Sequence, residues 1–187
     1  MKFNSTGLKG SYVIDVFPIE DERGWFVRTF CKDEFREIGH TKEWLQMNHS
    51  FTNEAGSIRG MHFQKPPFSE IKLIRCIAGK VFDVIIDLRK NSDTFLKWFG
   101  AELSAKNKKM IYIPEGFAHG FQTLTGDCQL LYNHSEFYKP NVEDGIRYDD
   151  EMIDINWPLP PKNISERDQK FGLIDDHFEG LNINNEL

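Results

Sequence analysis

Short runs of β-branched, aromatic and other apolar residues, each ended by Gly, Asn, Asp or Pro, follow one another along most of this chain. Residues 73–77 and 81–88 are two such runs, and Ala78-Gly79 between them is typical of a tight turn, which predicts a β-hairpin. Other runs predict further strands at residues 11–17, 99–103, 110–113, 120–124 and 129–134. Short strands at this spacing predict an all-β domain, built as a sandwich or as a jelly-roll barrel.

Only a few segments depart from this succession of strands. Residues 33–38 predict a helix that stops at Gly39, and Ser165 predicts the start of a second short helix. Residues 21–24 predict a turn before an aromatic run. The Pro-rich residues 157–161 predict an extended, rigid segment within an irregular C-terminal part.

The 187 residues contain no repeat, low-complexity tract or linker, so we expect one domain over residues 1–187, with a loose tail at residues 181–187. A net charge of −6 argues against nucleic acid or a membrane as a partner. The three cysteines lack Cys-x-x-Cys spacing, which indicates neither a disulfide framework nor a thiolate zinc site. Because no signal peptide or membrane helix is recognisable either, we expect a cytoplasmic protein.

Two segments carry most of the functional information. Residues 114–119 read Pro-Glu-Gly-Phe-Ala-His, which resembles the second signature of cupin β-barrels and would point His119 into the barrel. Where a metal-binding cupin has His-x-His and a Glu, this chain has only His62, with Gln64 two residues later and Glu70 beyond the usual reach. Histidines beside Arg and Lys, without a full ligand set, indicate acid/base chemistry on an anionic substrate rather than a metal site.

These and other segments, in their order, resemble the dTDP-4-dehydrorhamnose 3,5-epimerase family from about residue 17 to residue 171. Two blocks are distinctive: Arg-Gly-x-His-x-Gln at residues 59–64 and Gly-Phe-Ala-His-Gly-Phe at residues 116–121. The other matching blocks are Arg23-Gly24-x-Phe26, Gln46-x-Asn48-x-Ser50, Lys72, residues 81–84, residues 87–89, Tyr132, Tyr138-x-Pro140, Glu143-x-Gly-Ile146, Trp157-Pro158 and Ser165-x-Arg-Asp168. The resemblance implies a cupin-type double-sheet jelly-roll barrel with a few short helices, in a homodimer that exchanges N-terminal arms.

The same resemblance implies a reaction that needs neither a metal nor another cofactor. Family members take a nucleotide-diphosphate 4-keto-6-deoxy sugar and invert the carbons on both sides of the ketone, carbons 3 and 5. We expect dTDP-4-dehydro-6-deoxy-D-glucose as the substrate and dTDP-4-dehydro-L-rhamnose as the product. Because a proton is removed beside a ketone, the site needs a base, a cation near the enolate oxygen, and an acid on the opposite face of the sugar.

Four residues are expected to be catalytic. His62 would be the base, since an imidazole titrates near neutral pH, and Asp168 would orient its other ring nitrogen. Lys72 would lie near the enolate oxygen. Tyr132 would return a proton to the carbon from the opposite face.

A larger set is expected to bind the substrate, because each member matches a contact position of the family. The set is Arg23, Phe26, Arg28, Gln46, Asn48, Arg59, His119, Tyr138, Glu143 and Arg167. Arg59 and Arg167 would hold the diphosphate, and the nucleotide base would stack on Tyr138. The arm residues would come from the neighbouring subunit. Arg28 stands where the family usually has Glu, which predicts weaker discrimination for thymidine unless this side chain turns into solvent.

Simpler interpretations of single residues stay open at this level. Asp168 follows Ser165 at the spacing of a capping box and could serve only the helix. Lys72 could lie at the barrel rim, and Tyr132 could be one more aromatic residue of a strand. His119 could only fill the lumen. Glu143 could be a solvated loop charge.

Three other functions also stay open. The chain could be a mono-epimerase that inverts carbon 3 or carbon 5 alone, because the sequence does not give the volume in which the sugar must turn over. A metal-dependent cupin oxygenase would use His62, Glu70 and His119 as ligands. A non-catalytic cupin would bind sugars without proton transfer.

Overall fold

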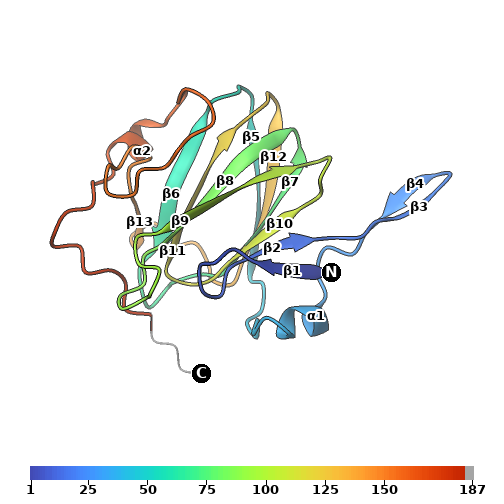
Figure 1. The fold of residues 1–187 in the computed structure, drawn as a ribbon, viewed down its shortest axis with the longest axis horizontal. Coiled ribbons are helices and arrows are strands. Elements are labelled where there is room, and N and C mark those ends of the chain that lie inside the picture. The colour runs from blue at the N-terminus through green and yellow to red at the C-terminus, as the bar shows by residue number, and fades with distance from the viewer. Residues whose placement is uncertain (184–187) are drawn as a thin grey trace.

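A computed structural model describes residues 1–183 and folds them into two antiparallel sheets and a small hairpin (Figure 1). The six-stranded sheet has the order β1 (Lys2–Ser5), β2 (Tyr12–Asp15), β10 (Met110–Ile113), β7 (Lys72–Ala78), β12 (Cys128–His134) and β5 (Gln46–Thr52). The five-stranded sheet has the order β13 (Glu143–Gly145), β6 (Ile58–Gln64), β11 (Phe117–Thr123), β8 (Lys80–Asp87) and β9 (Trp98–Ser104). Because the chain crosses repeatedly between two sheets, the prediction of an all-β double-sheet barrel is confirmed.

Each predicted strand is present, with its ends shifted by a few residues. The hairpin turn between β7 and β8 depends on Gly79, which has a φ of +71° and where a Cβ would lie 2.7 Å from the Cys128 sulfur. Strands β5 and β6 were not predicted. Their side chains toward the cavity are mostly polar, so neither strand has the apolar inner face by which a half-buried strand is recognised.

The predicted helices are short. Helix α1 spans Lys32–Arg36, and α2 spans Glu166–Gln169 with Ser165 as its N-cap. The predicted turn at residues 21–24 joins β3 (Ile19–Asp21) to β4 (Gly24–Phe26). No helix within residues 1–183 has both the length and the apolar character needed to cross a membrane.

Leu181, the first residue of the predicted loose tail, is attached to the barrel. Leu181 is bonded through its N–H to Leu88 and through its carbonyl to Lys90, so it is attached to the end of β8. Residues 184–187 of the predicted tail lie outside the described residues.

Three apolar clusters hold the sheets together. One cluster fills one end of the space between the sheets and includes Ile74, Val81, Ile85 and Leu130. The outer face of the five-stranded sheet packs under the C-terminal segment, and the outer face of the six-stranded sheet packs under α1. Since these clusters fill one end of the barrel and cover both outer faces, the other end of the barrel is free to hold polar side chains.

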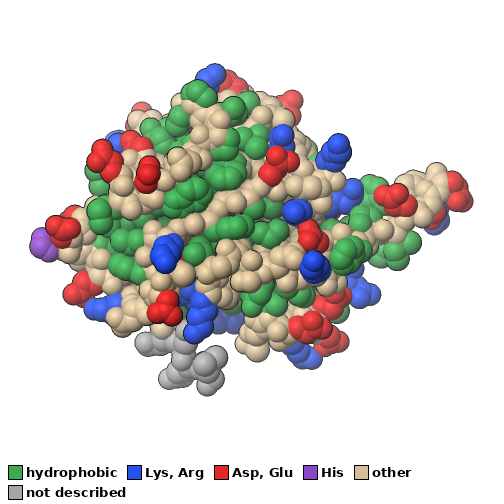
Figure 2. All heavy atoms as spheres, in the orientation of Figure 1, with side chains coloured by type: hydrophobic (Ala, Val, Ile, Leu, Met, Phe, Trp, Pro, Cys, Tyr) green, Lys and Arg blue, Asp and Glu red, His purple; other side chains and the backbone are tan. Residues whose placement is uncertain are grey.

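The β3–β4 hairpin projects away from the barrel, near the N-terminus (Figure 1). This hairpin, residues 19–26, is here called the arm. Its apolar side chains are uncovered: Ile19 and Phe26 are each 73% exposed and Trp25 is 50% exposed (Figure 2). A two-stranded hairpin is at best marginally stable by itself, so the arm is expected to need a surface to pack on.

Candidate active site

A cavity of about 900 Å³ opens at the polar end of the barrel, between β5, β7 and β12 on one side and β6, β11 and α2 on the other. Its size is in the range of ligand pockets. The predicted site residues that line it are His62, Lys72, Tyr132, Asp168, Gln46, Asn48, Arg59, His119, Tyr138, Glu143 and Arg167. The predicted residues that do not line it are Arg23, Phe26 and Arg28 of the N-terminal part.

A bulge in β6 brings Arg59 and His62 to the same side of that strand. The register of β6 against β11 shifts by one residue at Gly60 and Met61. Residues three apart in a regular strand point to opposite faces, whereas one extra residue returns them to the same face. Gly60 permits the bulge, because it has a φ of +129° and a Cβ there would lie 2.5 Å from the Cα of Gly120.

His62 is paired with Asp168, as predicted. The His62 Nε2 atom lies 2.9 Å from Asp168 Oδ1, and the backbone N–H of Gly60 donates to Asp168 Oδ2 at 3.1 Å. The cap of α2 uses a different group: Ser165 Oγ accepts the backbone N–H of Asp168. The carboxylate is therefore directed at His62, and the interpretation of Asp168 as a capping residue alone is wrong.

The charge on Asp168 determines which nitrogen of His62 is available. Burial raises the pKa of Asp168, but the contacts with His62 and with the Gly60 N–H outweigh this and lower it to about 2. An ionised carboxylate accepts the proton on Nε2, which leaves the lone pair on Nδ1. Within residues 1–183 no protein group is bonded to Nδ1. Since Arg167 Nη2 lies 3.0 Å from Nε2, a cation also lies beside the base.

The other polar residues near α2 form ion pairs that a ligand could reach. Arg167 Nη1 lies 2.8 Å from Glu143 Oε2, and the Tyr138 hydroxyl donates to the same oxygen at 2.9 Å. Glu143 is thus not a free loop charge. Arg59 donates from Nε to Thr52 Oγ1 at 2.9 Å, across the cavity mouth from β6 to β5. Both guanidinium groups keep part of their surface exposed, as an anion site requires.

Tyr132 lies on the opposite sheet from His62. Its hydroxyl and the hydroxyl of Ser50 are hydrogen-bonded at 2.9 Å, and its ring contacts His119 edge-on and His134 face-on. Burial raises the pKa of Tyr132 well above the usual range of a phenol. The hydroxyl therefore keeps its proton at neutral pH, as a general acid must.

Lys72 is buried rather than at the rim, so the rim interpretation is wrong. It is 6% exposed and shares the inner face of β7 with Ile74 and Cys76, as predicted. Its Nζ donates to the backbone carbonyl of His62 at 3.3 Å and lies 3.1 Å from Glu70 Oε1. The ammonium group thus lies between the two sheets, beside the strand that carries the base.

His119 has a carboxylate partner that the sequence did not indicate. Its Nε2 atom lies 2.9 and 3.1 Å from the two oxygens of Asp83, which is fully buried on β8. Burial raises the pKa of Asp83. His119 is therefore held at the inner end of the cavity by a second His–carboxylate pair.

The ligand set of the metal-dependent alternative is not assembled. Glu70 is bound to Lys72 and to His134 instead of facing His62 and His119. In the part of the chain that the structure describes, no three His, Cys, Asp or Glu side chains come together as metal ligands.

The arm residues and Arg28 lie away from the cavity of their own chain. Arg23 is paired with Asp21 in the turn of the arm, and Phe26 is exposed. Arg28 Nη1 lies 3.3 Å from Glu34 Oε1, and 65% of the Arg28 side chain remains exposed. None of the three therefore contacts the cavity in the part of the chain that the structure describes.

The sequence analysis did not assign Asp83 or His134 to the site, and it named Glu70 only as a metal ligand of an alternative function. Asp83 lies in the matching block at residues 81–84, and Glu70 lies just after the segment that contains His62. Their histidine partners, His119 and His134, are recognisable only from the three-dimensional contacts. His134 had one usable signal, since it lies two residues after Tyr132 on one strand and therefore on the same face.

Comparisons with known proteins agree with this geometry. The family model described as dTDP-4-dehydrorhamnose 3,5-epimerase matches residues 5–176. A protein of that name from Shigella flexneri is 44% identical over 155 residues, covering 81% of this chain and 85% of the relative.

Solved structures agree as well. The crystal structure of a Legionella pneumophila 3,5-epimerase in complex with dTDP-4-keto-L-rhamnose superimposes with a TM-score of 0.89 at 34% identity, covering 96% of this chain and 97% of that one. A 3'-monoepimerase from Streptomyces bikiniensis is more distant, at 28% identity and a TM-score of 0.83, with 89% and 85% coverage. The chain belongs to the dTDP-4-dehydrorhamnose 3,5-epimerase family, whose members are isomerases that act on sugar nucleotides.

Proposed function

We propose that this chain inverts carbons 3 and 5 of dTDP-4-dehydro-6-deoxy-D-glucose, with His62 as the base and Tyr132 as the acid. The observation that carries the assignment is the placement of the two groups on opposite sheets of one cavity, His62 on β6 and Tyr132 on β12. An inversion needs a proton to leave one face of the carbon and another to arrive on the opposite face.

The proposed steps follow from two groups, the ionised Asp168, which leaves the lone pair of His62 on Nδ1, and the Tyr132 hydroxyl, which keeps its proton. His62 Nδ1 takes the proton from the carbon, and the electron pair of the C–H bond moves to the ketone oxygen to give an enolate. The Lys72 ammonium stabilises that oxygen, because it is a buried cation on the wall between the two groups. Tyr132 then donates its hydroxyl proton to the carbon, and solvent restores the starting protonation of both residues.

The nucleotide end of the substrate lies at the cavity mouth. Arg59 and Arg167 bind the diphosphate, and the half-exposed ring of Tyr138 stacks on the nucleotide base. Gln46, Asn48, His119 and Glu143 contribute contacts to the sugar or the nucleotide. Because a diphosphate is a strong acceptor, it competes with Glu143 for the guanidinium of Arg167.

The active form is a homodimer that exchanges arms. Strand β5 is an edge of the six-stranded sheet, and its outward residues Met47 and Phe51 are exposed. The arm and the free edge of β5 are complementary. A strand of the arm can pair with that edge, and the apolar side chains of the arm can cover Met47 and Phe51. In this arrangement Arg23, Phe26 and Arg28 reach the partner's cavity.

The proposed location of the protein is the cytoplasm. Its three cysteines are free, which suits a reducing compartment.

A test is proton NMR of the substrate with the enzyme in deuterated water. We expect the signals of the protons on carbons 3 and 5 both to disappear, with formation of the L-rhamno product. Exchange at one carbon alone would indicate a mono-epimerase. No exchange, with retained binding of dTDP, would indicate a non-catalytic cupin and overturn the proposal.

A further inference from the structure

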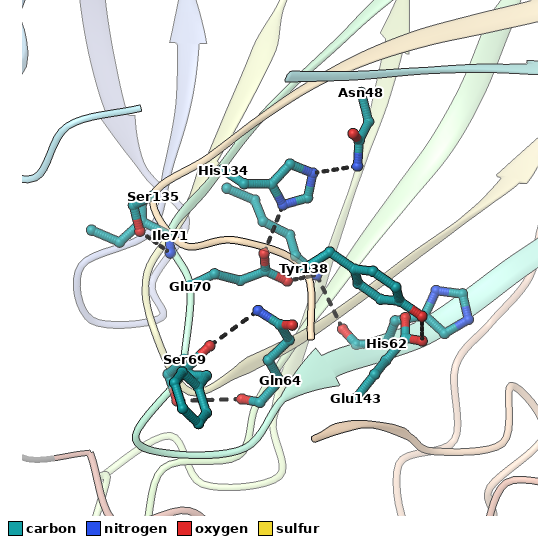
Figure 3. Close-up of polar contacts among 12 residues, drawn as sticks. Asn48, His62, Gln64, Ser69, Glu70, Ile71, His134, Ser135, Tyr138 and Glu143 are labelled. Atoms are coloured by element: carbon teal, nitrogen blue, oxygen red, sulfur yellow. Dashed lines mark hydrogen bonds and ion pairs between the residues drawn. The ribbon is translucent and has the colours of Figure 1, made fainter. Parts of the chain in front are cut away.

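Glu70 joins Lys72 to His134 in a buried network on the wall formed by the six-stranded sheet. Glu70 Oε1 lies 3.1 Å from Lys72 Nζ, and Glu70 Oε2 lies 2.7 Å from His134 Nδ1. The three side chains are only 8–10% exposed. Figure 3 shows His134 between Glu70 and Asn48, with the carboxylate of Glu70 directed at the imidazole.

The strand register explains why these groups meet. Lys72 on β7, His134 on β12 and Gln46 on β5 occupy one row across three neighbouring strands. Directly opposite residues have side chains on the same face of a sheet, here the face toward the cavity. Glu70 enters from the loop before β7 and places its carboxylate between the first two members of the row.

Glu70 supplies the charge that Lys72 needs in order to stay buried as a cation. Burial raises the pKa of Glu70, but Lys72 and His134 together lower it to about 2. A buried ammonium group without a counterion is strongly disfavoured, and breaking such a pair leaves an uncompensated charge. The ammonium assigned to the enolate oxygen therefore depends on a residue that does not itself belong to the proton transfer.

His134 connects this cation to the part of the cavity that receives the nucleotide. Its Nε2 atom lies 3.4 Å from Asn48 Nδ2, while Gln46 donates to Asn48 Oδ1 at 3.1 Å. The side-chain oxygen of Gln46, Oε1, in turn accepts a hydrogen bond from the backbone N–H of Tyr138 at 3.0 Å. Because an amide nitrogen only donates, Nε2 accepts and the ring proton lies on Nδ1, where it is donated to Glu70.

We propose that Glu70 and His134 are positioning residues for the epimerisation: Glu70 holds the Lys72 ammonium toward the ketone oxygen, and His134 holds Glu70 and Asn48 in place. This inference rests on the proposed function. The proposal predicts two separate effects. Loss of Glu70 should displace the Lys72 ammonium and lower kcat, whereas loss of the contact between His134 and Asn48 should weaken dTDP binding.

The first test is Glu70→Gln, which keeps the shape and removes the charge. We expect kcat to fall about tenfold, with binding of dTDP unchanged within about twofold, because one electrostatic contact to the transition state is weakened rather than removed. Glu70→Asp keeps the charge and should recover part of the lost kcat. The matched control is Glu136→Gln, which removes a nearby carboxylate whose only hydrogen bond among residues 1–183 is to the backbone N–H of Phe137.

A double-mutant cycle separates positioning from a purely structural role. If Glu70 acts through Lys72, then Glu70→Gln should cause no further loss of deuterium exchange in a Lys72→Met background. Equal losses in both backgrounds would overturn the inference, and so would a kcat for Glu70→Gln within about twofold of the wild type. Thermal unfolding of each variant identifies losses that come from unfolded protein.

The two bonds of His134 can be tested separately. His134→Asn can keep a donor near the Nδ1 position, so it should lower kcat less than His134→Ala and weaken dTDP binding a few-fold. His134→Ala should lower both kcat and the affinity for dTDP. Identical behaviour of the two variants would contradict the assignment of His134. The proposed function fails by a different result, namely no exchange at either carbon with the wild-type enzyme.

Discussion

The cavity and the arm differ in whether their side chains have partners within the chain. In the cavity, His62, Lys72 and Arg167 each have a carboxylate partner within the chain. In the arm, Ile19 and Phe26 are uncovered, and Arg23 is paired only within its own turn. Because the proposed reacting groups all come from one chain, mutations in the cavity should change the chemistry without changing the assembly, whereas mutations in the arm should act through the assembly.

The largest effect is expected for His62→Ala. Because one base serves both carbons when the ring turns over, exchange in deuterated water should fall about 10³-fold at both positions. Binding of dTDP, measured by calorimetry, should stay within a few-fold because Arg59 and Arg167 are untouched. Near wild-type exchange would locate the base at another residue.

Tyr132→Phe should separate proton removal from inversion. Net inversion should fall about 10²-fold, while exchange at carbon 3 survives in part, because His62 can return a deuteron to the face from which it took the proton. Comparing exchange and product formation in one NMR time course is sufficient. If both fall equally, Tyr132 stabilises the enolate and is not the acid.

Asp168→Asn should slow the reaction about 10- to 100-fold, less than His62→Ala, because it detunes the base without removing it. It should also change acid stability. The pKa of Asp168 is lowered from 3.8 to about 2, so its ionised form stabilises the fold above pH 3.8, and this contribution is lost as the pH falls toward 2.

The expected size of the acid effect is about 2 kcal/mol, from the lowering of the pKa. Urea unfolding across this window should show the difference in unfolding free energy between wild type and Asp168→Asn shrinking as the pH falls. A difference that stays constant with pH would mean that the fold does not lower the pKa of Asp168.

The arm is tested by the double variant Ile19→Ser and Phe26→Ser. If the arms exchange as proposed, loss of two exposed apolar side chains should convert the proposed dimer to monomers in analytical ultracentrifugation. It should also weaken dTDP binding about tenfold, because the partner's Arg23 would be withdrawn. Met152→Ser is the matched control, since Met152 is also exposed but lies in the C-terminal part. A monomeric wild type with full activity would contradict arm exchange.

Arg28→Glu should have the smallest effect. If Arg28 reads the nucleotide of the partner's cavity, the wild type should bind UDP and CDP within about tenfold of dTDP, and the variant should restore the preference for dTDP. Competition binding with dTDP, UDP, CDP and GDP measures this. The contact with Glu34 competes with this role, and an unchanged dTDP preference would show that Arg28 does not read the nucleotide.

Most of the cavity could be predicted because its residues lie in short, recognisable blocks. His62, Lys72, Tyr132 and Asp168 all line it, although they come from four different elements. The carboxylate partners of the other two histidines could not be predicted in the same way. A pair such as His119 and Asp83 is defined by the register of β11 against β8, and register is set by the whole hydrophobic pattern and by the turns.

The sequence alone determined the all-β class and the position of the hairpin turn at Gly79, because turn chemistry and strand periodicity are local properties. Its resemblance to a known family also indicated the groups proposed for proton transfer. Tertiary structure decided which of those groups meet. The bulge at Gly60 turns Arg59 and His62 to one face, and the pairing of β7 with β12 brings Lys72 to His134. Such contacts depend on strands far apart in the chain, and a shift of one residue in register would turn each side chain to the opposite face.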